Sequence, residues 1–107
     1  MPQTTHTFAL DLHALRKDAH ATLANHTLPR YDEVLVQITE KRVVCEALAT
    51  AIERRMSTPD TSVSATLTEC RTVAQRPIGP GLVSADDLHT KLARTVLELA
   101  DILDLLA

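Results

Sequence analysis

The chain has 107 residues, a length that suits one domain. Its apolar fraction of 45%, charged fraction of 23% and formal charge of −3 are those of a globular protein, and they exclude a collagen-like or intrinsically disordered chain. No basic run could neutralise a row of phosphates, and Phe8 and Tyr31 are the only aromatic residues, so the composition argues against nucleic-acid binding.

Other features of the sequence bear on its cellular location. No apolar stretch approaches the roughly 20 residues of a membrane span, and Met1 to His6 lacks the pattern of a secretory signal. We therefore expect a cytoplasmic protein that does not bind membranes. Cys45 and Cys70 lie among apolar residues, which favours two reduced thiols in the core. A disulfide or a reactive thiol is the alternative.

The first two predicted elements are helices with apolar residues at steps of three and four. One should run from about Leu10 to Asn25, and the other is long, from about Pro29 to Arg55, with Thr27 as a cap. The first helix should turn one face inward, made of Phe8, Leu12, Leu15, Ala19 and Leu23. The main stripe of the long helix should be Tyr31, Leu35, Ile38, Cys45, Ala49, Ile52 and Met56.

Two further helices complete the predicted fold. The third should span about Ser62 to Gln75, capped by Asp60 or Ser62, with Val63, Leu67, Cys70 and Ala74 inward. The fourth should begin at Ser84, where Ser84 and Asp87 form a capping box, and continue to about Leu106. Its inward residues should be Leu88, Leu92, Val96, Leu99, Leu103 and Leu106.

These elements predict an all-α protein, an antiparallel four-helix bundle with one long central helix, as a single domain over residues 1–107. Both glycines fall between Arg76 and Ser84, which leaves the rest of the chain free to be helical. The alternative is a three-helix protein with an irregular first segment.

Arg42 is the most unusual residue of the predicted core. On a 100° wheel it falls at the centre of the main stripe, and Glu46 follows one turn later. A guanidinium in apolar surroundings needs a carboxylate or an anionic ligand. One interpretation is a buried structural pair or an Arg42 that extends to the rim of the bundle. The other is a polar pocket, in which Arg42 holds an anionic group and Glu46 acts as a base.

Carboxylates and histidines supply weaker candidates. Asp101 and Asp104 lie on a partly polar face, and their negative charges interact unfavourably with the dipole at the end of the helix. We expect them to form ion pairs with a cation, for which Arg94, Arg16 and Arg42 are the candidates. The alternatives are a role in acid–base chemistry or a position on a solvated face. The spacing of the histidines provides no metal motif, so neither a metal nor a cofactor is expected. The histidines stand at positions His6, His13, His20, His26 and His89.

Extra apolar surface suggests a partner. The long helix carries a second strip, and the last turn of the fourth helix, Ile102 to Leu106, is apolar on most sides. The second strip consists of Val36, Val43, Val44, Ala47 and Leu48. It is either an interface or the second face of a helix that is covered on both sides.

The last forty residues resemble a family of small actinobacterial proteins of unassigned function that are associated with natural product biosynthesis. The resemblance lies in Glu69-Cys70-Arg71, in Gly79-Pro80-Gly81 and in the segment from Leu92 to Asp101. Members of that family carry Leu-Ala-Arg-x-Val-x-x-Leu-x-Asp followed by His-Tyr. This chain matches at Leu92, Ala93, Arg94, Val96, Leu99 and Asp101, but has Ile102 and Leu103 in place of His-Tyr. The resemblance implies a cytoplasmic bacterial role in specialised metabolism.

Two functions are therefore expected. The first is a pathway protein with a pocket for a small anionic intermediate. Such a protein either only binds the intermediate or, without a cofactor, catalyses its ring closure with loss of sulfate or phosphate. Its candidate catalytic residues are Glu46 and Asp101, and its candidate binding residues are Arg42, Tyr31 and Arg94. The second is a non-catalytic accessory module that forms a homodimer or docks onto a pathway enzyme.

Overall fold

The computed structural model describes residues 11–25, 27, 29–58 and 60–106. These residues form four α-helices and no strand, which confirms the predicted all-α bundle. The helices are α2 (Leu12–Ala24), α3 (Tyr31–Arg55), α4 (Thr61–Ala74) and α5 (Gly81–Leu106). The predicted first residue Leu10 and the predicted core residue Phe8 lie outside the described residues.

Aspartates cap the two shorter helices. The Asp11 carboxylate accepts a hydrogen bond from the backbone N–H of Ala14 at 3.0 Å. The Asp60 carboxylate accepts from Ser62 at 2.9 Å and from Val63 at 3.1 Å, so the predicted Asp60 cap is confirmed. Each cap satisfies backbone donors that the first turn of a helix leaves without an intrahelical partner.

The start of α3 differs from the prediction. Arg30 precedes the first helical residue and makes no side-chain capping bond, so the predicted Thr27 cap is wrong. Thr27 instead donates its N–H and its hydroxyl to the Asn25 side chain, both at 3.0 Å, and so closes a local turn. Charges at the two ends of α3 complement its dipole. They are Asp32 and Glu33 in the first turn and Arg54 and Arg55 in the last.

Helix α5 begins three residues earlier than predicted. Gly81 has a φ of 84°, a backbone conformation that glycine adopts without strain, and the helix starts there. A Cβ on Gly79 would lie 2.9 Å from the Cβ of Ser84, so the loop packs directly against the first turn. The predicted capping box at Ser84 and Asp87 is therefore wrong. With 26 residues α5 is one residue longer than the 25-residue α3, and the bundle has two long helices instead of one.

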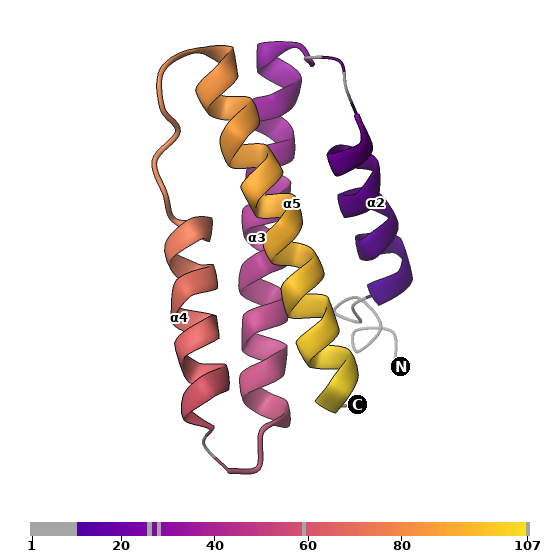
Figure 1. The fold of residues 1–107 in the computed structure, drawn as a ribbon, viewed down its shortest axis with the longest axis vertical. Helices are drawn as coiled ribbons and strands as arrows, with labels where there is room; N and C mark the ends of the chain where they lie inside the picture. The colour runs from indigo at the N-terminus through magenta and orange to yellow at the C-terminus, as the bar shows by residue number, and fades with distance from the viewer. Residues whose placement is uncertain (1–10, 26, 28, 59, 107) are drawn as a thin grey trace, which may run out of the picture.

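Consecutive helices alternate in direction, so α3 and α5 run the same way (Figure 1). These two helices form the most extensive contact of the bundle. Helix α2 packs on α5, whereas α4 packs on α3 and α5 from the opposite side (Figure 1). The described chain is flattened, with principal extents of 42 × 36 × 21 Å. The central pair thus separates the two short helices.

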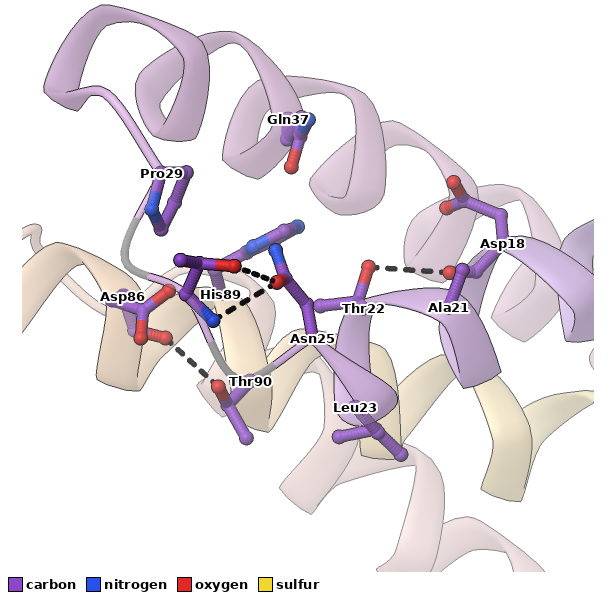
Figure 2. Close-up of a pocket in the computed structure, with 11 residues that line it drawn as sticks. Asp18, Ala21, Thr22, Leu23, Asn25, Pro29, Gln37, Asp86, His89 and Thr90 are labelled. Atoms are coloured by element: carbon purple, nitrogen blue, oxygen red, sulfur yellow. Dashed lines mark hydrogen bonds between the residues drawn. The ribbon is translucent and has the colours of Figure 1, made fainter.

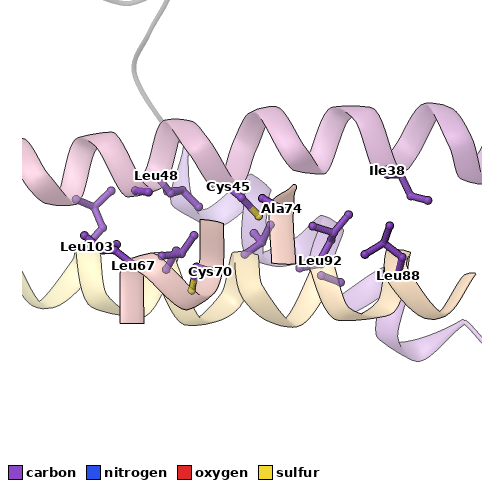
Figure 3. Packing of buried hydrophobic residues seen from close by; sticks show 14 of the residues in the cluster. Ile38, Cys45, Leu48, Leu67, Cys70, Ala74, Leu88, Leu92 and Leu103 are labelled. Carbon is purple, nitrogen blue, oxygen red and sulfur yellow. The ribbon is translucent and has the colours of Figure 1, made fainter. Parts of the chain in front are cut away.

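The core follows the contact between α3 and α5 (Figure 3). Buried residues on α3 recur at alternating steps of four and three, and Ala49 is buried next to them: Val34, Ile38, Lys41, Cys45, Leu48 and Ile52. This stripe is rotated from the predicted one. Tyr31 is 45% exposed, and Leu35 and Met56 are only partly buried, because the inward face centres on Lys41 and Leu48. Leu106, predicted to lie inward on α5, is also exposed at 36%.

Both cysteines are buried and free, in agreement with the prediction of core thiols. Burial raises the pKa of Cys45 and of Cys70 to about 12. Both thiols therefore stay protonated near neutral pH and behave as small apolar side chains. Cys70 also donates weakly to a carboxylate oxygen of Glu98 at 3.6 Å.

Candidate functional site

A cavity of about 250 Å³ lies where the end of α2 meets the first turns of α3 and α5 (Figure 2). Its walls come from three helices and from the segment that joins α2 to α3. The lining is mainly polar: Asp18, Ala21, Thr22, Leu23, Asn25, Thr27, Pro29, Gln37, Asp86, His89 and Thr90. Small-ligand sites in helical bundles are concave and contain converging polar groups, and the lining of this cavity is more polar than is usual for them.

His89 is the most deeply buried polar residue of this lining. The residue is 3% exposed, and its Nε2 finds no hydrogen-bond partner within the described part of the protein. Burial lowers the pKa of His89, and the positive charge of Lys41 lowers it further, so the imidazole is neutral near pH 7. A buried polar atom without a partner is unusual in native proteins and often marks a functional group.

Lys41 and Asp18 border the same region with opposite charges. Lys41 Nζ lies 3.1 Å from Asp18 Oδ2, and the Lys41 side chain is only 5% exposed, whereas that of Asp18 is 68% exposed. This ion pair connects α2 with α3. It offsets the desolvation of the ammonium group, and it neutralises the charge of Asp18 locally.

Two threonines present their hydroxyl oxygens at the cavity. Thr22 donates to the backbone carbonyl of Asp18 at 3.2 Å, and Thr90 donates to that of Asp86 at 3.0 Å (Figure 2). Because each hydroxyl hydrogen is used inside its own helix, each oxygen retains lone pairs that can accept from a ligand. Asn25 accepts two bonds from Thr27 at its side-chain oxygen, which leaves its amide N–H groups as donors.

Arg42 and Glu46 do not pair with each other. Arg42 donates through Nη2 to the backbone carbonyl of Arg76, in the segment between α4 and α5. Its Nε is buried and has no partner among the described residues. Arg42 is partly buried beside the core stripe instead of at its centre, since that place belongs to Lys41. The pairing of Arg42 with Glu46 that their spacing predicts is therefore wrong.

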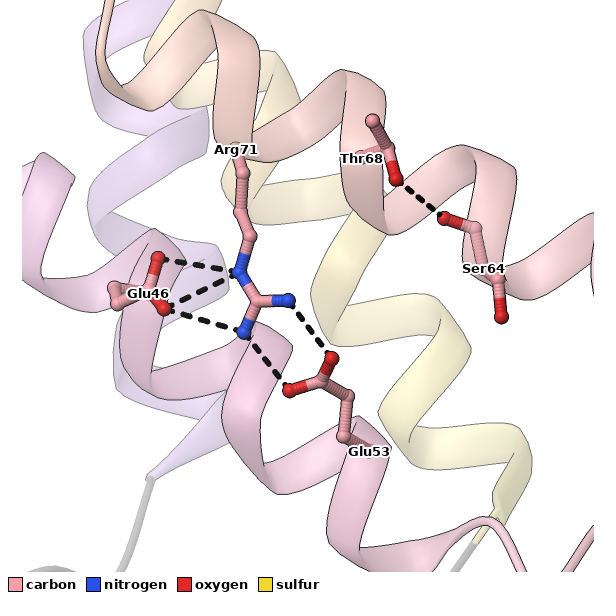
Figure 4. Close-up of polar contacts among 5 residues, drawn as sticks. All are labelled: Glu46, Glu53, Ser64, Thr68 and Arg71. Carbon is pink, nitrogen blue, oxygen red and sulfur yellow. Dashed lines mark hydrogen bonds and ion pairs between the residues drawn. The ribbon is translucent and has the colours of Figure 1, made fainter. Parts of the chain in front are cut away.

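Glu46 belongs to a cluster that attaches α4 to α3 (Figure 4). Arg71 Nε donates to Glu46 at 3.2 Å, and its two terminal nitrogens donate to Glu53 at 2.8 and 2.9 Å. Hydrogen bonding to Arg71 lowers the pKa of Glu53, and the two carboxylates raise the pKa of Arg71. Glu46 and Glu53 lie about one and three turns beyond Arg42 on α3, and both carboxylates bind Arg71 of α4.

The remaining candidate residues do not converge on the cavity. Asp101 and Asp104 both bind Arg16 of α2, at 2.9 and 3.3 Å, so Arg16 is the cation among the three expected for them. Arg94 is exposed on α5, with no carboxylate at ion-pair distance in the part of the chain that the structure describes. Tyr31, at the start of α3, is also exposed.

The second apolar strip of the long helix divides in the structure. Val36 and Val43 are 60% and 65% exposed, Val44 and Ala47 are partly buried, and Leu48 is fully buried. At the other end of the molecule Leu105 is 85% exposed, whereas Leu103 is in the core. None of the helices within the described ranges combines the length and apolar character needed to cross a bilayer. Among the same residues no group of three or more metal-ligating side chains comes together.

Sequence reasoning missed Lys41 and His89. The signal for Lys41 was present, because it completes the steps of four and three that connect Val34, Ile38 and Cys45. His89 follows the core residue Leu88 directly and faces inward because α5 is buried on a broad face. Only the placement of α2 against α5 shows that this histidine lines a cavity.

Comparison with protein-family models, with curated proteins and with solved structures found no match to this chain.

Proposed function

We propose that this chain is a small-molecule-binding protein whose ligand occupies the cavity between α2, α3 and α5. The observation that carries the proposal is His89, which is 3% exposed, lines the cavity, and has an Nε2 with no partner among the described residues. A polar group this deeply buried at the wall of a cavity, with unsatisfied hydrogen-bonding capacity, points to a site for a small polar ligand.

The size of the cavity limits the ligand. Its volume of about 250 Å³ is below the roughly 300–1,000 Å³ of pockets for drug-sized molecules. The ligand is therefore a small polar metabolite. An intermediate of specialised metabolism, which is the expectation from the sequence, is the class of metabolite that we propose. Ring closure at Arg42 and Glu46 stays a prediction, and the geometry favours the cavity over it because both side chains already hold other parts of the protein.

Blocking the cavity tests this function. Ala21 lines the cavity and is exposed on α2, so Ala21→Leu places a larger side chain at its mouth. Ala14, two turns earlier on α2, is exposed and does not line the cavity, so Ala14→Leu is the matched control. Small polar metabolites of each charge type are screened against the full chain by amide NMR. We expect binding that shifts Gln37, His89 and Thr90, that Ala21→Leu abolishes, and that Ala14→Leu retains. Shifts that are confined to other surfaces, or that survive Ala21→Leu, contradict the proposal.

The exposed valines of α3 favour a second candidate, the accessory module that forms a homodimer or binds a pathway enzyme. Val36 and Val43 stand seven residues apart, so they lie on one face of α3. Light scattering of the full chain separates the two candidates. A strict monomer with a ligand in the cavity supports the first, whereas a dimer that Val43→Glu dissociates supports the second.

A further inference from the structure

The balance of donors and acceptors in the cavity bears on the class of ligand. Asp86 contributes a partly buried carboxylate from the second turn of α5, and no cation within the described residues pairs with it. Asp18 contributes a second carboxylate, whose charge Lys41 balances from outside the lining. The side chains that line the cavity therefore carry net negative charge when His89 is neutral.

The uncharged groups reinforce this asymmetry. The hydroxyls of Thr22 and Thr90 give their hydrogens to backbone carbonyls, so they meet a ligand as acceptors. The neutral imidazole of His89 supplies one acceptor nitrogen. Donors come from the side-chain amides of Asn25 and Gln37. A ligand that supplies several N–H donors and a positive charge is complementary to this lining, and an anion is not.

We infer that the cavity binds a small hydroxylated amine, whose ammonium group pairs with Asp86 while its neighbouring polar atoms bond to His89 and Thr90. This inference rests on the proposed function, since it names the class of ligand for the same cavity. The anionic ligand expected from the sequence was assigned to Arg42, whose guanidinium donates to the Arg76 carbonyl instead and does not line this cavity.

Three matched probes distinguish the possible charges. Serinol, glycerol and glycerate share a three-carbon skeleton and carry a positive, no and a negative charge at neutral pH. Each is titrated into the full chain, and the amide shifts of Gln37, His89 and Thr90 are followed by NMR. We expect serinol to bind in the millimolar range, and glycerol and glycerate at least about tenfold more weakly, a difference of about 1.4 kcal/mol.

Asp86→Asn removes the charge and keeps the shape of the side chain. We expect it to weaken serinol about tenfold, equivalent to about 1.4 kcal/mol, and to leave glycerol unchanged. Asp87→Asn is the control, because Asp87 is the next residue of α5 but lines a different recess beside Arg76 and Lys91. It should bind serinol as the wild type does.

Two results overturn the inference and leave the proposed function intact: glycerate binding in the cavity at least as tightly as serinol, or Asp86→Asn binding serinol normally. If none of the three probes shifts the cavity residues, the inference is also wrong. The metabolite screen with Ala21→Leu then decides separately whether the cavity binds another class of molecule.

Discussion

Lys41 places a charged group inside the contact between the two long helices. Its ammonium is nearly fully buried and depends on the mostly exposed carboxylate of Asp18. Removing one or the other member of such a pair has unequal effects on the free energy of unfolding. Replacing the charged member by an apolar residue of similar length is often neutral or stabilising, whereas removing only its partner leaves an uncompensated buried charge.

We expect Asp18→Asn to lower the free energy of unfolding by about 1–3 kcal/mol, because the buried ammonium loses its charged partner. Lys41→Met should cost less than Asp18→Asn, and it should be close to neutral because the methionine fills the same space. Urea unfolding of the full chain measures both, with Asp87→Asn as an exposed control. A greater loss of stability in Lys41→Met would show that Asp18 is not the partner on which the buried charge depends.

For single residues, the sequence predicted which apolar positions are buried better than it predicted the contacts of the charged residues. The pattern identified the core positions Ile38, Cys45, Ala49 and Ile52 correctly, because they lie where the predicted and the observed inward faces of the long helix overlap. It placed Arg42 inside and left Lys41 without a role, since a rotation of one position along the wheel separates the two stripes. The direction of that rotation is set by what α5 and α2 present to α3, which no local pattern contains.

Helix α4 is attached differently from the other elements. It is short, has three buried residues, Leu67, Cys70 and Ala74, and covers α3 and α5 from one side. At the exposed edge of α4, Arg71 forms ion pairs with the carboxylates of Glu46 and Glu53 on α3. Partly exposed ion pairs contribute little each, but a planar guanidinium that bridges two carboxylates fixes the orientation of a helix.

Arg71→Met should loosen α4 selectively. We expect faster amide hydrogen exchange across α4 and unchanged exchange in the middle of α5, because local opening affects only the helix that has lost its ion pairs with α3. Raising the ionic strength should reduce the difference from the wild type, since salt screens the pairs that the variant lacks. Arg94→Met, at an exposed arginine of α5, provides the control. Uniformly faster exchange in all helices would instead indicate global destabilisation.

Element boundaries show where local sequence rules hold. The Asp60 cap was predictable because one side chain and two nearby backbone N–H groups define it. The start of α5 was not, because Ser84 and Asp87 look like a capping box, and the outcome depends on Gly79 lying against Ser84. Local chemistry alone thus permitted two starts, and loop packing selected the earlier one.

At the scale of the whole molecule, the histidine that lines the cavity also affects how the free energy of unfolding depends on pH. His89 meets charged groups from every element around it: Lys41 of α3, Asp18 of α2 and Asp86 of α5. Because the pKa of His89 is lower in the folded state, protons bind it more readily in the unfolded chain. Its contribution to stability is complete above the ordinary histidine pKa of about 6.5 and is lost as the pH falls toward the lowered value.

We expect the free energy of unfolding of the wild type to fall more steeply from about pH 7.5 to about pH 5 than that of His89→Leu. Urea titrations at a series of pH values give this slope for both proteins. His20→Gln, at an exposed histidine of α2, should keep the wild-type slope. Equal slopes for the wild type and His89→Leu would mean that the buried imidazole does not contribute.

The arrangement of the helices was predicted in outline only. Four amphipathic segments with short connections implied a bundle, and the structure confirms it. The close contact between α3 and α5 could not be predicted, because it requires two helices that run in the same direction to pack together. That contact flattens the molecule and places α2 on α5. The cavity exists because of this placement, and none of the site residues expected from the sequence lines it.

The packing of α2 on α5 also has a consequence for the order of events on the ribosome. Arg16 meets Asp101 and Asp104 across 85 and 88 positions of the chain, so α2 has its main binding surface only after α5 has been made. Contacts across this much sequence close slowly, because the loop-closure entropy is lost before the contact forms. During synthesis α2 can pack on α5 only after α5 has been made, so the cavity, which is lined by residues of both helices, forms after that point.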